Sequence, residues 1–225
     1  MVKVLIDRNI ERYSVTHNTR TVPQTINWGL NPSTLLVAQR SYDCPGDDEL
    51  FIQEQLPYLV SVCIAAREGK IEFYTSQELF MEAVRQPISK QGYLGINWLA
   101  NVPIKKIPCP VDRMAQWNKV IDPLVDFGTE EQLKFFRTIQ EPRFVHLWKT
   151  LGDAQIADAF HLWTAETASL EVFLTMDKKF LNNVYNRRKA IDSTVTVLSP
   201  KDLCEKCGLA PSDIEQLAAQ INPYS

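Results

Sequence analysis

The chain has 225 residues, of which 45% are hydrophobic and 23% are charged, and its formal net charge is −3. This length and composition allow one large domain with a substantial core and exclude a chain that is disordered throughout. The small negative net charge gives no global field that attracts nucleic acid, although a local basic patch or a bound metal ion can override the total.

The cysteines and the first residues indicate a cellular compartment. Five cysteines, an odd number and few for the length, fit a reducing environment better than a disulfide framework. The apolar run Val2–Ile6 is too short for a signal peptide or a membrane span. We therefore expect a cytoplasmic protein with no membrane partner.

Strands and helices alternate along the predicted fold. Five nearly continuous apolar runs predict strands buried on both faces of a parallel sheet, namely Val2–Ile6, Ile71–Thr75, Ile104–Val111, Val172–Met176 and Val195–Leu198. Helical spacing predicts helices over Asp47–Lys70, Glu78–Gln86, Glu130–Thr138, Phe144–Leu151, Ala154–Ala168, Lys178–Lys189 and Lys201–Cys207. This alternation predicts an α/β fold of three layers, α/β/α, around a mainly parallel central sheet of about five strands.

Residues 14–45 fit this scheme least well, because they are rich in Thr, Asn, Pro and Ser. We interpret them as an insertion after the first strand, with a candidate strand pair at Thr21–Ile26 and Thr34–Gln39. The chain then divides into a single domain over residues 1–208, which carries the insertion, and a C-terminal short helix with a tail over residues 209–225.

Four acids occupy informative places. Asp7 ends the first strand, Glu78 follows the second, Asp158 lies in a helix and Asp177 ends the fourth strand. Ligands of open parallel sheets bind beyond the carboxyl ends of the strands, so we expect these acids to converge there. Clustered carboxylates repel one another, and a hard cation such as Mg²⁺ or Mn²⁺ relieves the repulsion. Taken singly, each strand-end acid is more often a turn or cap residue, but their joint placement favours a metal site that hydrolyses phosphodiesters.

Three segments resemble one family. VKVLIDRN, TSQELFMEA and IADAFHLWTAETASLEVFLTMDKKF resemble the acidic motifs of PIN-domain nucleases, which include bacterial toxin ribonucleases and RNA-processing enzymes. The resemblance implies a PIN-like fold and a metal-dependent endoribonuclease with Mg²⁺ or Mn²⁺ as cofactor. RNA would be its substrate, and an antitoxin protein is a candidate partner. Whether the chain forms a homo-oligomer is left open. It also implies catalytic, metal-binding roles for Asp7, Glu78, Asp158 and Asp177, an orienting role for Asn9 and a supporting hydroxyl role for Thr175.

Arg8 departs from the family pattern, which has a small hydroxyl residue beside the first acid. It could pair with a carboxylate or hold a phosphate, and this keeps open a catalytically inactive PIN-like module that binds RNA or protein. The candidate RNA-binding residues are Arg8, Lys178, Lys179, Arg187 and Arg188, although basic residues on a helix are more often its solvated face. A third possible class is a phosphotransferase or phosphatase that uses Asp7 as an aspartyl nucleophile. That chemistry requires a second acid two residues later, where this chain has Asn9. His161 follows Asp158 by one helical turn, and a structural histidine is favoured there.

Overall fold

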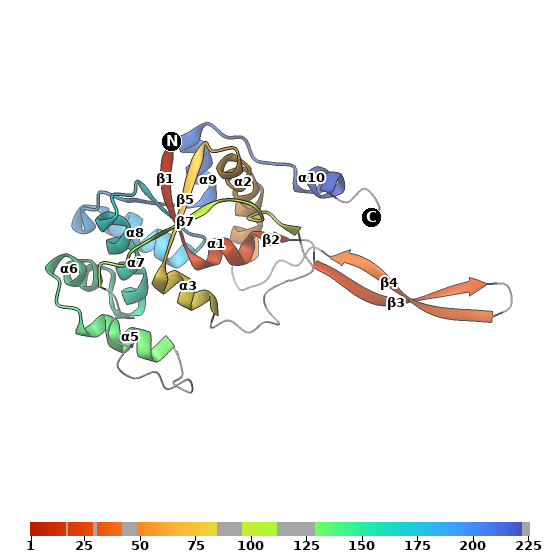
Figure 1. Cartoon of the computed structure of the whole chain (residues 1–225), viewed down its shortest axis with the longest axis horizontal. Coiled ribbons are helices and arrows are strands. Elements are labelled where there is room, and N and C mark those ends of the chain that lie inside the picture. Colours follow the sequence, from red (N-terminus) through yellow and green to blue (C-terminus); the bar gives the residue numbers. More distant parts are fainter. Residues whose placement is uncertain (17, 29–30, 42–48, 85–95, 112–128, 222–225) are drawn as a thin grey trace.

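The central sheet has five parallel strands. The computed structural model describes residues 1–16, 18–28, 31–41, 49–84, 96–111 and 129–221, and for 18–28 and 31–41 it describes the backbone. Within these residues the sheet order is β7-β5-β1-β8-β9 (Figure 1). The strands are β1 (Val2–Ile6), β5 (Ile71–Ser76), β7 (Ile104–Ile107), β8 (Val172–Leu174) and β9 (Thr196–Leu198). The predicted mainly parallel sheet is therefore confirmed.

β1 lies in the middle of the sheet, where the strand order reverses. The chain passes from β1 outward to β5 and β7, and then returns to the other side of β1 to form β8 and β9. The register aligns Ile6 with Leu174. Beyond the last pair, the backbone N–H of Asp7 donates a 2.9 Å hydrogen bond to the carbonyl of Leu174. The carboxyl ends of β1 and β8 therefore lie level with each other at the switch point of the sheet.

Helices cover both faces of the sheet (Figure 1). Their bounds are α1 (Arg8–Tyr13), α2 (Glu49–Arg67), α3 (Gln77–Val84), α5 (Thr129–Thr138), α6 (Pro142–Leu151), α7 (Ile156–Thr167), α8 (Lys178–Ile191), α9 (Pro200–Cys207) and α10 (Ile214–Ile221). Helices α2 and α9 pack together on one face, and α5 to α8 pack on the other. In the described residues, no helix is long and apolar enough to cross a membrane.

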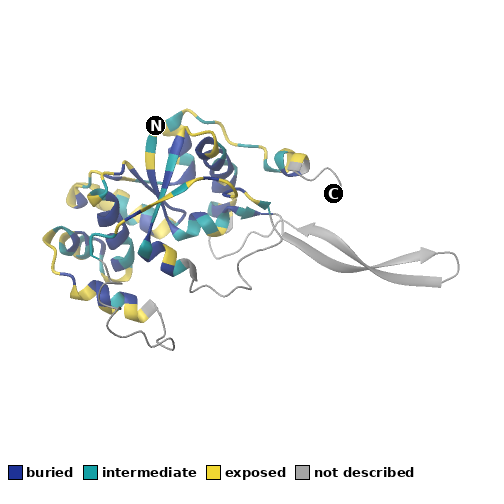
Figure 2. Cartoon of the chain, in the orientation of Figure 1, coloured by how far each residue is buried: buried dark blue, intermediate teal, exposed yellow. Residues whose placement is uncertain are grey.

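The two faces of the sheet have separate cores because side chains alternate along each strand. Val4 and Ile6 of β1 are fully or almost fully buried in the core that contains α2 and α9. Leu5 between them and Phe173 of β8 lie in the opposite core, among the aromatic side chains of α5 to α8. Figure 2 shows the middle of the sheet buried between the helical layers, whereas the edge strand β7 exposes Lys105 and Lys106. The three-layer α/β/α arrangement predicted from the sequence is thus present.

Some predicted boundaries differ from the observed ones. β7 ends at Ile107 instead of Val111, since Pro108 and Pro110 have no N–H with which to continue a ladder. The predicted helix over residues 154–168 opens with a separate 3₁₀ turn, Asp153–Gln155, ahead of α7. The predicted helix ends at 47–48 and 85–86 and parts of the 14–45 insertion lie outside the described residues.

The insertion contains a long hairpin. β3 (Asn18–Trp28) and β4 (Asn31–Ser41) pair antiparallel along their whole length, so the predicted strand pair is confirmed and is longer than expected. The hairpin forms a sheet of its own and extends away from the central sheet (Figure 1). At its base, β2 (Val15–Thr16) pairs antiparallel with β6 (Ile96–Asn97).

Candidate functional site

The acids come from elements that meet at the carboxyl end of the sheet. Asp7 directly follows β1, and Asp177 follows β8, the strand next to it. Asp158 lies in the first turn of α7, which packs beside β8. Glu78 and Glu82 lie on α3, which follows β5 on the other side of β1. The sheet topology thus brings the predicted acids to one end of the molecule.

Asp7 is buried and held by three hydrogen bonds. Its side chain is 7% exposed. Oδ1 accepts the backbone N–H of Arg8 at 2.6 Å, and Oδ2 accepts the Asn9 amide and the Thr175 hydroxyl, each at 2.6 Å. The carboxylate of Asp7 is therefore fixed by donors that follow the carboxyl ends of both β1 and β8.

Asn9 and Thr175 also fix each other. The Asn9 amide donates to the Thr175 hydroxyl oxygen at 3.0 Å, and the Asn9 carbonyl oxygen accepts the backbone N–H of Met176 at 2.8 Å. The Thr175 oxygen also accepts the backbone N–H of Asp177 at 3.0 Å. The contacts with Asp7 that the family resemblance implies for Asn9 and Thr175 are present.

The electrostatics of Asp7 and Asp158 are unusual. Burial raises the pKa of Asp7 to about 6, against the lowering effects of the Thr175 hydrogen bond and the His161 charge, and the Glu82 charge raises it further. Burial also raises the pKa of Asp158 well above its ordinary value, and the charges of Asp7, Asp177 and Glu82 add to this. Neighbouring acidic charge thus adds to the effect of burial at both Asp7 and Asp158.

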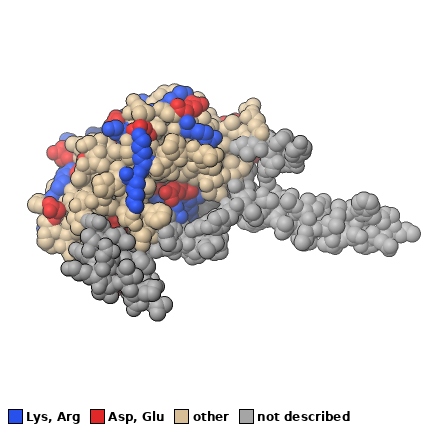
Figure 3. Space-filling view, viewed as in Figure 1, with Lys and Arg blue, Asp and Glu red and all other residues tan. Residues whose placement is uncertain are grey.

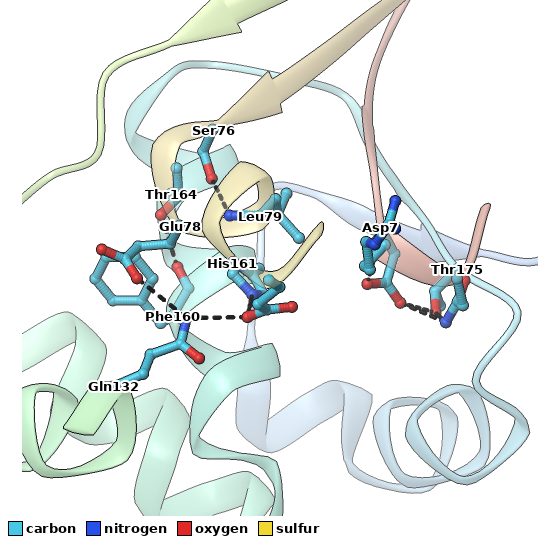
Figure 4. A network of polar contacts seen from close by, with 12 residues as sticks. Asp7, Ser76, Glu78, Leu79, Gln132, Phe160, His161, Thr164 and Thr175 are labelled. Atoms are coloured by element: carbon cyan, nitrogen blue, oxygen red, sulfur yellow. Dashed lines mark hydrogen bonds and ion pairs between the residues drawn. The ribbon is translucent and has the colours of Figure 1, made fainter. Parts of the chain in front are cut away.

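Of the two acids on α3, Glu82 is the one whose charge raises the pKa values of Asp7 and Asp158. Glu78 is 2% exposed and accepts a 3.0 Å hydrogen bond from the Gln132 amide of α5. Figure 4 shows Glu78 and Gln132 on the far side of His161 from Asp7 and Thr175. Asp7 and Asp177, two of the other predicted acids, thus act on the pKa of Asp158 together with Glu82, which lies one helical turn beyond Glu78.

His161 connects α7 to this group. It is 1% exposed, and its Nε2 lies 3.0 Å from Oε1 of Glu82. Burial lowers the pKa of His161, but the adjacent Glu82 carboxylate, with Asp7 and Asp158 farther off, raises it above its ordinary value overall. The structural role expected for this histidine is therefore accompanied by a direct contact with an acid of the site.

Two of the acids also cap helices. Asp7 is the N-cap of α1, and Asp177 is the N-cap of α8, where its Oδ1 accepts the backbone N–H of Phe180 at 2.8 Å. A carboxylate at a helix N-terminus satisfies a backbone donor and complements the helix dipole. The cap role that is usual for a strand-end acid is thus observed at both positions.

The donor chemistry suits a hard cation, because carboxylate oxygens are the ligands that Mg²⁺ and Mn²⁺ prefer. The raised pKa values of Asp7 and Asp158 fit the same ion, since a positive charge would favour their ionised forms. Among the described residues, however, no three His, Cys, Asp or Glu side chains lie close enough around one point to hold a metal ion. The residues fit a divalent cation in chemical type, without forming a ready-made cage.

The predicted RNA-binding residues fall into three places. Arg8 forms an ion pair with Glu11, one turn along α1. Lys178 and Lys179 are exposed in the first turn of α8, directly after Asp177. Arg187 and Arg188 lie in the second half of α8, away from the helix end that follows Asp177. Positive and negative side chains are interspersed over the face drawn in Figure 3. The structure therefore places only the first three of these residues beside the acids.

No family model, curated protein or solved structure matches the chain.

Proposed function

We propose that the chain is a ribonuclease that hydrolyses phosphodiester bonds with a divalent metal ion, Mg²⁺ or Mn²⁺. The observation that carries the proposal is the pair Asp7 and Asp158, whose pKa values are raised by burial and by neighbouring acidic charge. Carboxyl groups with such perturbed pKa values, at the switch point of a parallel sheet, are typical of functional sites. The acidic motifs that resemble those of PIN-domain nucleases specify the reaction.

The side chains of the site have separable tasks in this proposal. Asp7, Asp158 and Asp177 would hold the ion, with Glu82 as the nearest acid of α3. When bound, the ion supplies an activated water and charge stabilisation at the leaving oxygen. Asn9 and Thr175 donate to Oδ2 of Asp7 and so fix the direction of that carboxylate.

The first turn of α8 supports an anionic substrate. The Lys178 ammonium lies 5.8 Å from the centroid of the Phe51 ring, and the exposed Lys179 follows it in the first turn of α8, where the helix dipole favours negative charge. An RNA backbone supplies that charge next to Asp177. Restraint by an antitoxin partner belongs to the same proposal.

The test uses a mixed RNA pool and purified protein with and without Mn²⁺. Wild-type protein should cleave RNA only with the metal, and Asp7→Asn or Asp177→Asn should abolish cleavage while leaving the far-UV circular dichroism unchanged. Asp153→Asn is the matched control, because Asp153 is exposed and its carboxylate accepts a hydrogen bond from Trp148, outside the acid group. Mn²⁺ at about 100 times its dissociation constant should also stabilise the fold by about 2.7 kcal/mol.

A second candidate function is an inactive module that binds RNA or protein. It is favoured by the absence, within the described residues, of three side chains gathered for a metal ion, and by the cap roles that account for Asp7 and Asp177. This candidate gains if Mn²⁺ neither stabilises the protein nor stimulates cleavage. If the wild-type protein is inactive and Arg8→Thr restores cleavage of RNA, Arg8 is the cause of the missing activity.

A further inference from the structure

Two carboxylates on α3 share one amide group. Glu78 and Glu82 lie four residues apart on the helix, where like charges face each other and repel. Nε2 of Gln132 donates to Oε2 of Glu78 at 3.0 Å and to Oε1 of Glu82 at 3.0 Å. One amide from α5 therefore bridges both acids, and Figure 4 shows Gln132 below α3, on the same side as Glu78.

Gln132 and His161 are buried more deeply than Glu82. Gln132 is 2% exposed and His161 is 1% exposed, whereas the side chain of Glu82 is 24% exposed. The His161 ring also lies edge-on to Phe160 and Phe173, with centroid separations of 6.0 Å and 6.3 Å. Packed side chains hold their rotamers, so Gln132 and His161 form the fixed frame and Glu82 is the group that they orient.

One oxygen of Glu82, Oε1, accepts hydrogen bonds from Gln132 at 3.0 Å and from Nε2 of His161 at 3.0 Å. Two donors on one oxygen, from two different helices, restrict the rotation of the carboxylate. The charge of Glu82 acts on Asp7 and Asp158, so this carboxylate belongs to the same local field as the acids at the strand ends.

We propose that Gln132 is a positioning residue, which anchors on Glu78 and, together with His161, fixes the orientation of the Glu82 carboxylate. The proposal rests on the proposed function for its consequence, since an oriented Glu82 would serve metal binding. Glu78 is then the anchor of Gln132 and not a member of the metal-binding group. A neutral amide suits this task because it satisfies two carboxylates without adding a positive charge that competes with a cation.

The experiment measures the Mn²⁺ dissociation constant of the full chain by calorimetry, and the side-chain Nε2–H signal of His161 by NMR without metal. Gln132→Met keeps the length of the side chain and removes the donors, and should weaken Mn²⁺ binding about 10-fold or more, as loss of a ligand's hydrogen-bond partner commonly does. It should also shift the His161 signal. Gln55→Met is the matched control, because Gln55 is 3% exposed and bonds to the backbone of Lys201 in the core on the opposite face of the sheet.

A second pair of variants separates the two acids. Glu78→Gln keeps an acceptor oxygen for Gln132 and should leave the Mn²⁺ dissociation constant close to the wild-type value, whereas Glu82→Gln should raise it about 10-fold or more. The proposal is overturned if Gln132→Met binds Mn²⁺ as Gln55→Met does, or if Glu78→Gln loses binding as Glu82→Gln does. If wild-type protein binds no Mn²⁺, the proposed function fails, and the His161 signal alone then decides whether Gln132 positions Glu82.

Discussion

Asp7 has two roles that oppose each other energetically. As N-cap of α1 and acceptor of three hydrogen bonds, it stabilises the surrounding backbone. As a buried carboxylate near Asp158 and Glu82, it is unfavourable in its ionised form. Sites that maintain such groups commonly sacrifice stability for function.

The opposition between these roles predicts a pH dependence without metal. The pKa of Asp7 is about 6 in the folded protein and has an ordinary value of 3.8, so between these pH values the folded state binds more protons than the unfolded state. Stability therefore falls as pH rises through this window, by about 3 kcal/mol from Asp7 alone. Asp7→Asn should remove this slope and, after about 1 kcal/mol is lost with one hydrogen bond, be about 2 kcal/mol more stable at pH 8.

Urea denaturation at intervals between pH 4 and pH 8 measures this difference. Asp153→Asn should keep the wild-type slope, because Asp153 lies on the surface outside the acid group. An Asp7→Asn protein that is less stable than wild type at every pH would show that the cap and hydrogen bonds outweigh the cost of the buried charge.

The choice between Glu78 and Glu82 shows the limit of sequence reasoning at this scale. Strand ends can be located from apolar runs, so Asp7 and Asp177 are predictable, and Asp158 follows from the helix beside them. Glu78 and Glu82 are one turn apart on the same short helix, and periodicity gives both the same face. Gln132, 50 residues beyond Glu82, distinguishes them in space. No local sequence pattern predicts the contact between Gln132 and Glu82.

At the scale of elements, one ionic group joins α6, α7 and the loop before β9. Arg143 of α6 donates to both carboxylate oxygens of Glu166 on α7, at 2.8 Å and 2.5 Å, and to the carbonyl of Asp192 at 3.1 Å. The Ser193 hydroxyl donates to Glu166 at 2.6 Å. A bidentate pair with further hydrogen bonds contributes more than a simple surface pair.

We expect Glu166→Ala to destabilise the protein by about 1–2 kcal/mol, because it removes three hydrogen bonds and leaves Arg143 without its carboxylate. Chemical denaturation measures the change. Glu68→Ala, which removes an ion pair with Lys70 that is exposed on both sides, should cost less than about 0.5 kcal/mol. Equal losses in the two variants would contradict a special role for the α6–α7 group.

Element boundaries were predictable where residue chemistry marks them. β1 has the predicted bounds because Asp7 follows an uninterrupted apolar run. The end of β7 was misplaced because the apolar pattern continues through the prolines to Val111, although the hydrogen-bond ladder does not. The 3₁₀ turn Asp153–Gln155 has helical spacing and so merges with α7 in the sequence.

At the scale of the molecule, the β3–β4 hairpin is structurally self-contained. Asn18 and Ser41 are directly paired at its base, so an Asn-Gly turn can join them after removal of residues 19–40. We expect the shortened protein to keep its fold and its melting temperature within about 4 °C, because in the described part of the chain the central sheet and the hairpin share no hydrogen-bonded ladder.

Circular dichroism and thermal unfolding provide the measurement for the shortened protein. Its Mn²⁺-induced stabilisation, where the full chain shows one, should be unchanged, since the acids lie at the end of the central sheet. Loss of cooperative unfolding on removal of residues 19–40 would show that the hairpin takes part in the fold of the body.

The pairing of β1 with β8 has a consequence for protein synthesis. The hydroxyl that bonds Asp7 belongs to Thr175, 168 residues later in the chain. A chain growing from its N-terminus can form β1, β5 and β7 as neighbours. The other edge of β1 can pair only after β8 has been synthesised. Such distant contacts are also the slowest to form. The acid group is therefore incomplete until β8 and Asp177 have been synthesised, and the proposed ribonuclease would become active only after that point.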